Sequence, residues 1–556
     1  MKILFLSAEV APYVSVGGLS QVMYFLPHSL MKQGHDVRVF TAKYGAMAKG
    51  DGHDEPWDFE LELPDLRVPI RHDNGKPNHE ADLLMFEDQR KKSALEYGGV
   101  GPDADHESEN EANFDGEISC DVLRLKPKRK TDTYLYAVDN QEYFGLRANV
   151  FGYADDHTRF ALLSKACLEW LLVQYERKQA GEKGVWWPDV INCHDWHTSY
   201  FIDLARRDER YRKVMAAMPI VLTVHNFSYQ GNDEYRYTAE AGKDNGLRPL
   251  APLTSMQLRR QNALKRGLLF ADAITTVSPT HAIEVLTPEY AEGLEDVLER
   301  TRGKLRGIMN GIDTTEFNPA TDELIHKRYG LRWFADARAA NKRDLQRSFG
   351  LPVDVERPLL ASVGRLSSQK GWDLLLETLP PLLTERPDVQ IVVVGTGEDS
   401  YRDALTELKE KFPDQVGLHL QPDFKLPRRV FSGADIVLMP SMFEPGGIVA
   451  LEALRYGAVP LVRRTGGLND SIEDFNPVTG GGTGFSFTTK NSWALYGAIV
   501  EALATYRHPK LWAHLVRNCL DADFSWDHAA REYKDWYSKA IRQRARSKAV
   551  TRAIKH

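Results

Sequence analysis

The chain has 556 residues, of which 42% are hydrophobic and 27% are charged, and its formal net charge is −7. This length exceeds what one hydrophobic core supports, so we expect at least two domains, and the composition excludes a fibrous or wholly disordered protein. The acidic balance argues against a general nucleic-acid binder.

Two further properties bear on the compartment and on the partners. No run approaches the roughly 20 apolar residues of a membrane span, and the apolar start ends at Glu9, too early for a signal peptide. Four cysteines without a CxxC pair argue against a disulfide scaffold or a zinc site. We therefore expect reduced thiols, a cytoplasmic protein, and neither nucleic acid nor a membrane among its partners.

Short apolar runs bounded by Gly, Asp or Pro recur along the chain and predict buried strands. In chain order these runs are 2–8, 36–41, 189–193, 220–225, 273–277, 306–310, 359–364, 390–394, 416–420, 435–439 and 459–462. Stretches with the helical period lie between them, at 158–178, 256–271, 369–384, 401–412, 447–456 and 491–506. Because runs without polar alternation are typical of parallel strands covered on both faces, the pattern predicts an α/β protein with doubly wound, Rossmann-like sheets.

The strands form two series, which predict two such domains. We expect the first domain in residues 1–320, with an insertion at about 45–130, and the second in residues 350–525. A C-terminal helix and basic tail would occupy 526–556, and we place the linker in 313–354. Ligands of open α/β sheets bind at the carboxyl ends of the strands, so we expect the active site in the cleft between the two domains.

Two charged segments stand apart from this pattern. Residues 102–117 carry seven acids and no Lys or Arg, which predicts a solvated loop. Residues 539–556 carry seven Lys or Arg and no acid, which predicts a frayed helical tail, with anion binding as the alternative.

The first motif with chemical meaning is Ser15-Val16-Gly17-Gly18-Leu19, between the first strand and an apolar helix. A glycine turn at this place lets the backbone approach a ligand, and a helix N-terminus favours anions. A tight turn alone also explains two glycines, so both interpretations stay open.

Two neighbouring strands end in histidine, at His194 of the His-Asp-Trp-His sequence and at His225. Polar side chains at strand ends of a doubly wound sheet point into the ligand crevice. A single histidine there is explained as a satisfied structural group, but two strands ending in this way favour function.

The second series carries cations and carboxylates at its strand ends. Arg365 and Lys370 flank a strand-to-helix turn, and two fixed cations beside a helix N-terminus suit a diphosphate. Glu444 and Glu452 lie two helical turns apart around a Pro-Gly-Gly turn, where a carboxylate can bind sugar hydroxyls or stabilise positive charge at an anomeric carbon. Surface cations and helix-surface acids are the plain alternatives.

These motifs resemble those of bacterial and plant-type glycogen (starch) synthases, retaining GT-B glucosyltransferases of family 5. The resemblance rests on residues 7–22, 153–163, 188–198, 222–231, 262–280, 307–322, 364–375, 440–472, 483–487 and 524–537. It implies transfer of glucose from a nucleoside diphosphate glucose to the non-reducing 4-OH of an α-1,4-glucan, with retention of configuration. ADP-glucose is the expected donor and UDP-glucose the alternative, and the family needs no cofactor and no bound metal.

The resemblance also assigns roles to individual residues. The catalytic group comprises His194 and Glu444 beside the transferred glucose, and Arg365 and Lys370 on the donor pyrophosphate. The substrate-binding group comprises Glu9, Ser15, Gly17, Gly18, Asp155, Asn262, Gly446, Gly447, Ile448 and Glu452. A phosphate oxygen of the leaving group is implied to take the acceptor proton, so no protein base is required.

The chain departs from the family pattern at several positions that bear on the donor. Ser15 stands where the family has Lys, Gln21 where it has Asp, Met442 where it has Arg, and Gly446 where it has Cys. Phe424 would replace the Tyr that stacks on the base. Conversely, Glu452 completes a Glu–seven residues–Glu pattern of related retaining transferases, in which the second Glu holds the ribose, and this favours a donor other than ADP-glucose. Two alternatives therefore remain: a related retaining GT-B transferase with another donor or acceptor, and a non-catalytic glucan-binding homologue.

Overall fold

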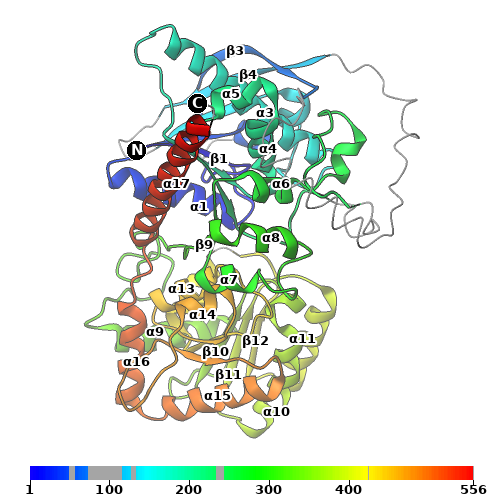
Figure 1. Cartoon of the computed structure of the whole chain (residues 1–556). Helices are drawn as coiled ribbons and strands as arrows, with labels where there is room; N and C mark the ends of the chain where they lie inside the picture. The colour runs from blue at the N-terminus through cyan, green and yellow to red at the C-terminus, as the bar shows by residue number, and fades with distance from the viewer. Residues whose placement is uncertain (49–56, 73–115, 127–132, 233–242, 424, 555–556) are drawn as a thin grey trace. The chain divides into compact units, whose positions relative to one another are not determined.

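The protein divides into two compact units of contacts. The structure, a computed structural model, describes residues 1–48, 57–72, 116–126, 133–232, 243–423 and 425–554. The first unit comprises Met1–Thr275, Val285–Leu305 and Ala530–His556, and the second comprises Thr276–Glu284 and Arg306–Ala529. Figure 1 shows the course of the chain and its labelled elements.

The first unit is built on a sheet whose strand order is β3-β4-β5-β2-β1-β6-β7-β8-β9. The strands are β1 (Lys2–Leu6), β2 (Asp36–Ala42), β3 (Phe59–Pro69), β4 (Glu117–Leu125), β5 (Tyr134–Asp139), β6 (Val190–His194), β7 (Ile220–Val224), β8 (Ala273–Thr276) and β9 (Leu305–Gly307). Strands β5, β2, β1, β6 and β7 pair in parallel, whereas β3 and β4 form an antiparallel edge. The chain runs from β1 outward through β2 and then returns to β6, so the strand order reverses between β1 and β6.

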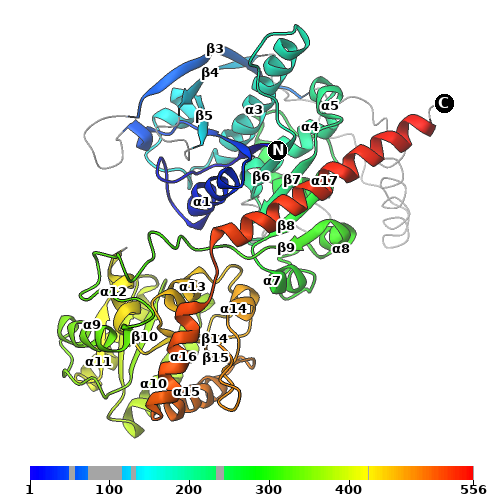
Figure 2. The same cartoon turned by 90° about the vertical axis from the view of Figure 1, so that its left-hand side faces the viewer.

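Helices cover both faces of this sheet. They are α1 (Gly18–Lys32), α3 (Asp156–Gln179), α4 (Ser199–Arg207), α5 (Glu209–Met215), α6 (Ala263–Phe270), α8 (Glu295–Thr301) and, from Ala530 onward, α17 (Trp526–Ile554). On β6, Ile191 and Cys193 belong to the same buried cluster as Cys167 of α3. Asn192 points to the opposite face, where it donates to Tyr537 Oη of α17 at 3.0 Å. Figure 2 shows α17 running along the strands of this unit.

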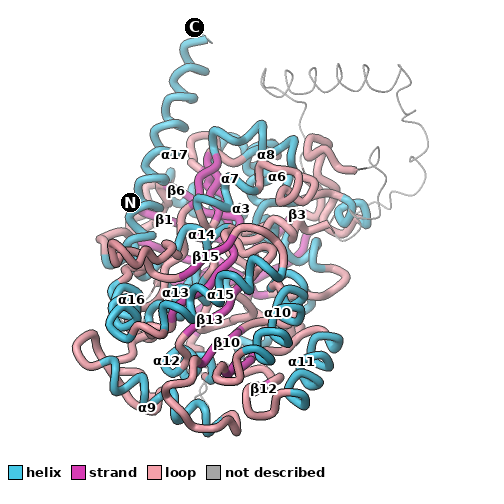
Figure 3. Tube along the Cα trace, turned by 90° about the horizontal axis from the view of Figure 1, so that it is seen from below, coloured by secondary structure: helices cyan, strands magenta, loops and turns pink. Residues whose placement is uncertain are grey.

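The second unit holds a parallel sheet in the order β12-β11-β10-β13-β14-β15. Its strands are β10 (Leu359–Val363), β11 (Gln390–Val394), β12 (Val416–His419), β13 (Ile436–Met439), β14 (Val459–Arg463) and β15 (Phe485–Phe487). Its helices are α7 (Pro279–Glu284), α9 (Phe334–Ser348), α10 (Trp372–Glu385), α11 (Asp399–Lys411), α12 (Leu426–Gly433), α13 (Ile448–Arg455), α14 (Gly466–Ser471), α15 (Ser492–Tyr506) and α16 (Pro509–Asp521). Figure 3 shows helices on both sides of these strands. The order reverses here between β10 and β13.

The predicted fold class, two doubly wound α/β sheets, is confirmed, but the division of the chain differs from the expected boundaries. The chain passes between the units next to residues 275, 284, 305 and 529, and not within 313–354. The reason is that α9 is integral to the second unit. Its Arg338 is buried and donates to the carbonyl oxygens of Phe431, Ala434 and Tyr456.

Local structure also differs from expectation in two places. The helix expected over 256–271 is a 3-10 turn at Met256–Arg260 followed by α6, because Asn262 caps α6 by accepting from Lys265 N. The segment 45–92, which shows no clear period, contains β3. Most of the acidic 102–117 segment lies outside the described residues. In the part of the chain that the structure describes, no helix combines the length and apolar character needed to cross a bilayer.

Candidate active site

In the first unit, the point where the strand order reverses brings together the residues that follow β1 and those that end β6. Ligands of doubly wound sheets bind at such points. Glu9 is 3% exposed, and its Oε2 accepts from Val16 N at 2.7 Å and from Gly17 N at 3.0 Å. Burial raises the pKa of Glu9. This carboxylate therefore fixes the glycine loop in front of α1.

The loop itself lies open. Ser15, Gly17 and Gly18 are exposed, and Ser15 Oγ lies 2.6 Å from Ser20 Oγ. Gly17 has an extended backbone with φ −145°, and a Cβ there would meet only Glu9 Oε1, at 3.7 Å. A tight turn therefore does not require glycine at this position, and the space beside Gly17 would admit a side chain.

His194 and His225 form a stacked and hydrogen-bonded pair. His194 Nδ1 lies 3.0 Å from His225 Nε2, and the ring planes are 21° apart. His194 is fully buried, and its Nε2 accepts from Asn192 Nδ2 at 3.0 Å. Burial lowers the pKa of both rings, that of His225 to about 4. Both ring nitrogens of His194 are therefore used inside the fold, and His225 is the partly exposed member.

Asp195 supports the pair from the turn after β6. It has a positive φ of 58°, which is costly for a residue other than glycine. Its Oδ1 accepts from His225 N at 2.7 Å, and burial raises the pKa of its carboxyl to about 7. This contact sets where the chain turns after β7.

Asp155 and Asn262, the two polar residues expected at the donor sugar, have different surroundings. Asp155 precedes α3, is about one third exposed, and pairs with Arg147 Nη2 at 2.7 Å. Asn262 is fully buried; its Oδ1 accepts from Lys265 N at 2.9 Å and its Nδ2 donates to Gln230 Oε1 at 2.6 Å. The side chain of Asn262 thus has partners within the protein at both ends.

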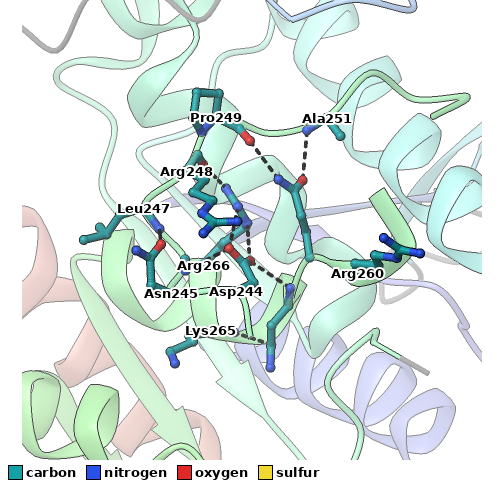
Figure 4. Close-up of polar contacts among 12 residues, drawn as sticks. Asp244, Asn245, Leu247, Arg248, Pro249, Ala251, Arg260, Lys265 and Arg266 are labelled. Atoms are coloured by element: carbon teal, nitrogen blue, oxygen red, sulfur yellow. Dashed lines mark hydrogen bonds and ion pairs between the residues drawn. The ribbon is translucent and has the colours of Figure 1, made fainter. Parts of the chain in front are cut away.

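Asn262 belongs to a buried polar network that organises the loop before α6. Figure 4 shows Asp244 and Arg266 of this network. Its backbone N donates to Asp244 Oδ2 at 2.9 Å. Arg266, also fully buried, donates to Asp244 Oδ1 at 3.0 Å and to Asp203 Oδ2 at 2.9 Å. Since a buried guanidinium without both carboxylates would be strongly destabilising, this network fixes the start of α6.

In the second unit, the charged residues gather at the reversal point between β10 and β13. Arg365, just after β10, is exposed, and within the described segments it forms no ion pair. Lys370 ends the 3-10 turn Ser368–Lys370, and its Nζ lies 2.5 Å from Glu444 Oε2. Ser441 Oγ donates to the same carboxylate oxygen at 3.1 Å. One pocket is lined by Gly364, Arg365, Lys370, Ser441, Glu444 and Gly447, among others.

Glycine makes this arrangement possible at two positions. Gly371 has φ +76°, and a Cβ there would lie 2.1 Å from Pro440 O, so the turn that carries Lys370 can pack against the end of β13. Gly447 has φ +62° and precedes α13, which begins at Ile448. The carbonyl of Glu444 accepts from Gly467 N at 3.0 Å, which holds the Gly446-Gly447 turn beside α14.

The sequence did not lead us to Arg463, whose side chain holds the segment just before Glu444. Arg463, the last residue of β14, is 4% exposed and donates to Ser441 O at 2.7 Å and to Met442 O at 2.5 Å. An arginine directly after the apolar run 459–462 was the available sequence signal. Gln369 adds a third support, because its Nε2 donates to Phe443 O at 3.1 Å.

Glu452 is not brought into this pocket. It lies on α13 near Arg428 and Glu316, and burial raises the pKa of its carboxyl to about 7 despite the attraction of Arg428. The prediction about Phe424 falls outside the described residues. Among the residues that are described, no group of three or more His, Cys, Asp or Glu side chains is arranged to hold a metal ion.

Two doubly wound units, with two cations and a carboxylate in one pocket at the reversal point of the second unit, suit a nucleotide-sugar-dependent glycosyltransferase. The family model described as the starch synthase catalytic domain matches residues 2–75 and 96–300, and that of glycosyl transferases group 1 matches residues 346–517. The chain therefore belongs to the glycogen and starch synthase family and is a glycosyltransferase.

Individual relatives agree over the whole length. A glycogen synthase of Streptococcus pneumoniae serotype 19F (strain G54) is 33% identical over 542 residues, which cover 97% of this chain and 100% of the relative. A glycogen synthase of Exiguobacterium sibiricum is 34% identical over 550 residues, which cover 97% of this chain and 98% of the relative. The catalytic domain of starch synthase IV from Arabidopsis thaliana, solved with ADP and acarbose, matches with a TM-score of 0.73 at 28% identity, over 97% of this chain and 99% of that one.

Proposed function

We propose that this glycosyltransferase moves glucose from ADP-glucose to the non-reducing 4-OH of an α-1,4-glucan, with retention of configuration. The observation that carries the proposal is the pocket in which Arg365, Lys370 and Glu444 meet at the reversal point of the second unit. The family membership of the chain supports the same reaction, as does its similarity to starch synthase IV, a protein solved with ADP and acarbose bound.

In this proposal the two cations stabilise the leaving diphosphate. Arg365 is exposed and without an ion pair in the described part of the chain, so it is available to a phosphate. The ammonium group of Lys370 already donates to the carboxylate of Glu444, and in the complex it would interact with both Glu444 and the diphosphate. Fixed charges cost no reorganisation as the leaving-group charge develops, which is why they lower the barrier.

The carboxylate of Glu444 would border the sugar carbon as it becomes oxocarbenium-like. Ser441 and Lys370 hold this carboxylate in one orientation, so its negative charge is in place before the bond breaks. A phosphate oxygen of the leaving group would accept the acceptor proton, and both bond changes would occur on one face of the sugar, which retains configuration.

The remaining assigned residues complete the proposed site. The exposed loop of Ser15, Gly17 and Gly18 would approach the substrates with its backbone, held by Glu9. Asp155 would contact the donor sugar, and the buried Asn262 would act by fixing the start of α6. The amides of Gly446, Gly447 and Ile448 would face the donor phosphates. Glu452 lies on α13 outside the pocket of Lys370 and Glu444, and a role on the ribose would require the donor to extend beyond that pocket. His194 would lie near the transferred glucose, with His225 as its hydrogen-bonded partner.

A cytoplasmic location is part of the proposal, because the free, buried thiols of Cys120, Cys167, Cys193 and Cys519 suit a reducing compartment. UDP-glucose is the alternative donor, since Ser15 departs from the family pattern and Glu452 completes a pattern of related retaining transferases. Ser15 also favours the second candidate function, a glucan-binding protein without activity, because it removes one cation from the loop.

The test is transfer of labelled glucose to glycogen from ADP-glucose and from UDP-glucose, each at several concentrations. Glu444→Ala serves as the inactive variant and Lys510→Ala, at an exposed position, as the matched control. Transfer from ADP-glucose that is lost only in Glu444→Ala is the expected result, and preference for UDP-glucose would correct the donor. A folded protein that transfers from neither would refute the proposed activity and favour the binding-only function.

A further inference from the structure

Hydrogen-bonded polar side chains form a continuous chain from β8 through β7 to β6 in the first unit, and this chain ends at His225, just after β7. Thr275 Oγ1 lies 2.7 Å from Thr223 Oγ1, and Thr223 Oγ1 donates to Asn192 Oδ1 at 3.0 Å. Asn192 Nδ2 then contacts His194 Nε2, and His194 Nδ1 contacts His225 Nε2, each at 3.0 Å. All of these residues except His225 are fully buried.

The direction of the hydrogen bonds follows from the donors and acceptors available. Asn192 uses its carbonyl oxygen for Thr223, so its amino group donates both to Tyr537 Oη and to His194 Nε2. His194 Nε2 is therefore an acceptor, and the neutral ring of His194 carries its proton on Nδ1. That proton is donated to His225 Nε2.

The same reasoning gives the tautomer of His225. Its Nε2 accepts a hydrogen bond, so the neutral ring carries its own proton on Nδ1. Burial keeps both rings neutral, since it lowers the pKa of His194 and of His225. Within the segments that the structure describes, His225 Nδ1 has no partner, and the residue is partly exposed. The chain of hydrogen-bonded side chains therefore ends in an N–H group that is available to a ligand.

The backbone of His225 is fixed as firmly as its ring. Asp195 accepts from His225 N at 2.7 Å, and Asp195 is held in a left-handed conformation to do so. A conformation of this kind persists only where the surrounding structure demands it, and such positions cluster at functional sites. The rigid placement of one N–H group is what recognition of a single ligand atom requires.

We propose that His225 contacts the substrate directly, donating from Nδ1 to one hydroxyl of the transferred glucose, and that His194 and Asn192 are positioning residues that set its orientation and tautomer. The inference rests on the proposed function. A sugar hydroxyl is the fitting acceptor because the ring is neutral, whereas phosphates are served by cations, which this chain places at Arg365 and Lys370.

Donor analogues that lack a single hydroxyl of glucose give a direct test. In the wild-type protein, kcat/KM should fall about tenfold for the analogue that lacks the hydroxyl contacted by His225. His225→Ala should reduce kcat/KM for the normal donor by a similar factor and should no longer distinguish that analogue from the normal donor. A purely structural role would lower the rates for both donors and leave their ratio unchanged.

Two conservative variants separate the two nitrogens of the ring. His225→Asn keeps an amide N–H near the position of Nδ1, so it should retain part of the discrimination. His225→Gln keeps a polar group near Nε2, toward His194, and should lose the discrimination. The exposed His326→Ala is the matched control and should leave both the rate and the ratio unchanged.

Nitrogen NMR of the wild-type imidazoles tests the tautomers independently of activity. We expect His194 and His225 both to be neutral and protonated on Nδ1 at pH 7. A His225 protonated on Nε2, or a deoxy-analogue ratio that is the same in wild type and His225→Ala, would overturn the inference. A wild-type protein that transfers from no nucleotide-glucose would instead refute the proposed function, and the NMR result would still decide the tautomer.

Discussion

Replacing Lys370 by alanine separates the contribution of this residue to activity from its contribution to stability. Its Nζ lies 2.5 Å from Glu444 Oε2, and the two side chains are 24% and 17% exposed. An ion pair that retains this much contact with water contributes at most about 1 kcal/mol to folding. For a unit of about 200 residues, this corresponds to a fall in Tm of no more than about 4 °C.

The expected effect on catalysis is much larger. In the proposed site, Lys370→Ala would remove one of two cations from the leaving diphosphate and would leave the carboxylate of Glu444 without its cationic partner. Loss of one preorganised group of this kind costs about 10²- to 10³-fold in rate, or about 2.7–4 kcal/mol. We therefore expect kcat/KM for the nucleotide-glucose donor to fall at least about 100-fold, with Arg365 still present.

The assay is steady-state transfer to glycogen, with thermal unfolding followed on the same preparations. Lys510→Ala, an exposed lysine in the first turn of α16, controls for the loss of one positive charge from the protein. A kcat/KM within threefold of wild type would refute the assignment of Lys370 to the diphosphate. A fall in Tm of 10 °C or more would show that the ion pair is a structural element and that the loss of activity is indirect.

Two further predictions concern stability. Gly371→Ala should destabilise the second unit by about 2 kcal/mol or more in urea unfolding, because both the left-handed φ and the 2.1 Å approach to Pro440 O disfavour a Cβ there. Gly330→Ala, which has open space around it, should change the free energy of unfolding little, and equal effects of the two variants would contradict the geometry. Acidification from pH 7.5 to 5.5 should increase hydrogen exchange around β6 and β7, because burial lowers the pKa of His194, His197 and His225 below the unfolded value of about 6.5. The stability that these neutral rings contribute is complete above pH 6.5. Below pH 6.5 it falls by up to about 1.4 kcal/mol per pH unit for each ring. Asp195 opposes one of these rings, since its raised pKa of about 7 favours the protonated, folded state as the pH falls; unchanged protection of β6 and β7 would refute this balance.

The strands were predictable because a buried parallel strand has no polar face. The runs 390–394 and 459–462 became β11 and β14 with almost the same bounds. Turn positions were predictable for a related reason, since Gly364 and Arg365 stand at the end of one apolar run and a Pro-Gly-Gly turn follows Glu444 a few residues after another. These features depend on local sequence, and the reversal of strand order then brings them together.

The division of the chain into units and the burial of His194 and His225 depend on contacts between residues that are distant in sequence. The chain passes between the units four times, and nothing local in 313–354 shows that α9 packs on the second sheet. His194 and His225 look equivalent as strand ends, yet only His194 is fully covered, on the face of β6 where Tyr537 of α17 also contacts Asn192. The burial of a polar side chain is decided by what packs over it, which sequence spacing does not reveal.

The two reversal points differ in charge, and the difference matches the two halves of the proposed donor. In the first unit the polar groups are kept neutral or have protein partners: the histidines are deprotonated, and burial raises the pKa of Glu9 and of Asp195. In the second unit the groups are charged, with Arg365 exposed and Lys370 paired, among the residues that the structure describes, with Glu444. A neutral set of hydrogen-bonding groups suits the hydroxyls of a sugar, whereas fixed cations suit a diphosphate. A donor that joins a neutral sugar to a charged diphosphate suits both kinds of site, and variants in either unit should reduce transfer, by about tenfold for His225→Ala and by at least about 100-fold for Lys370→Ala.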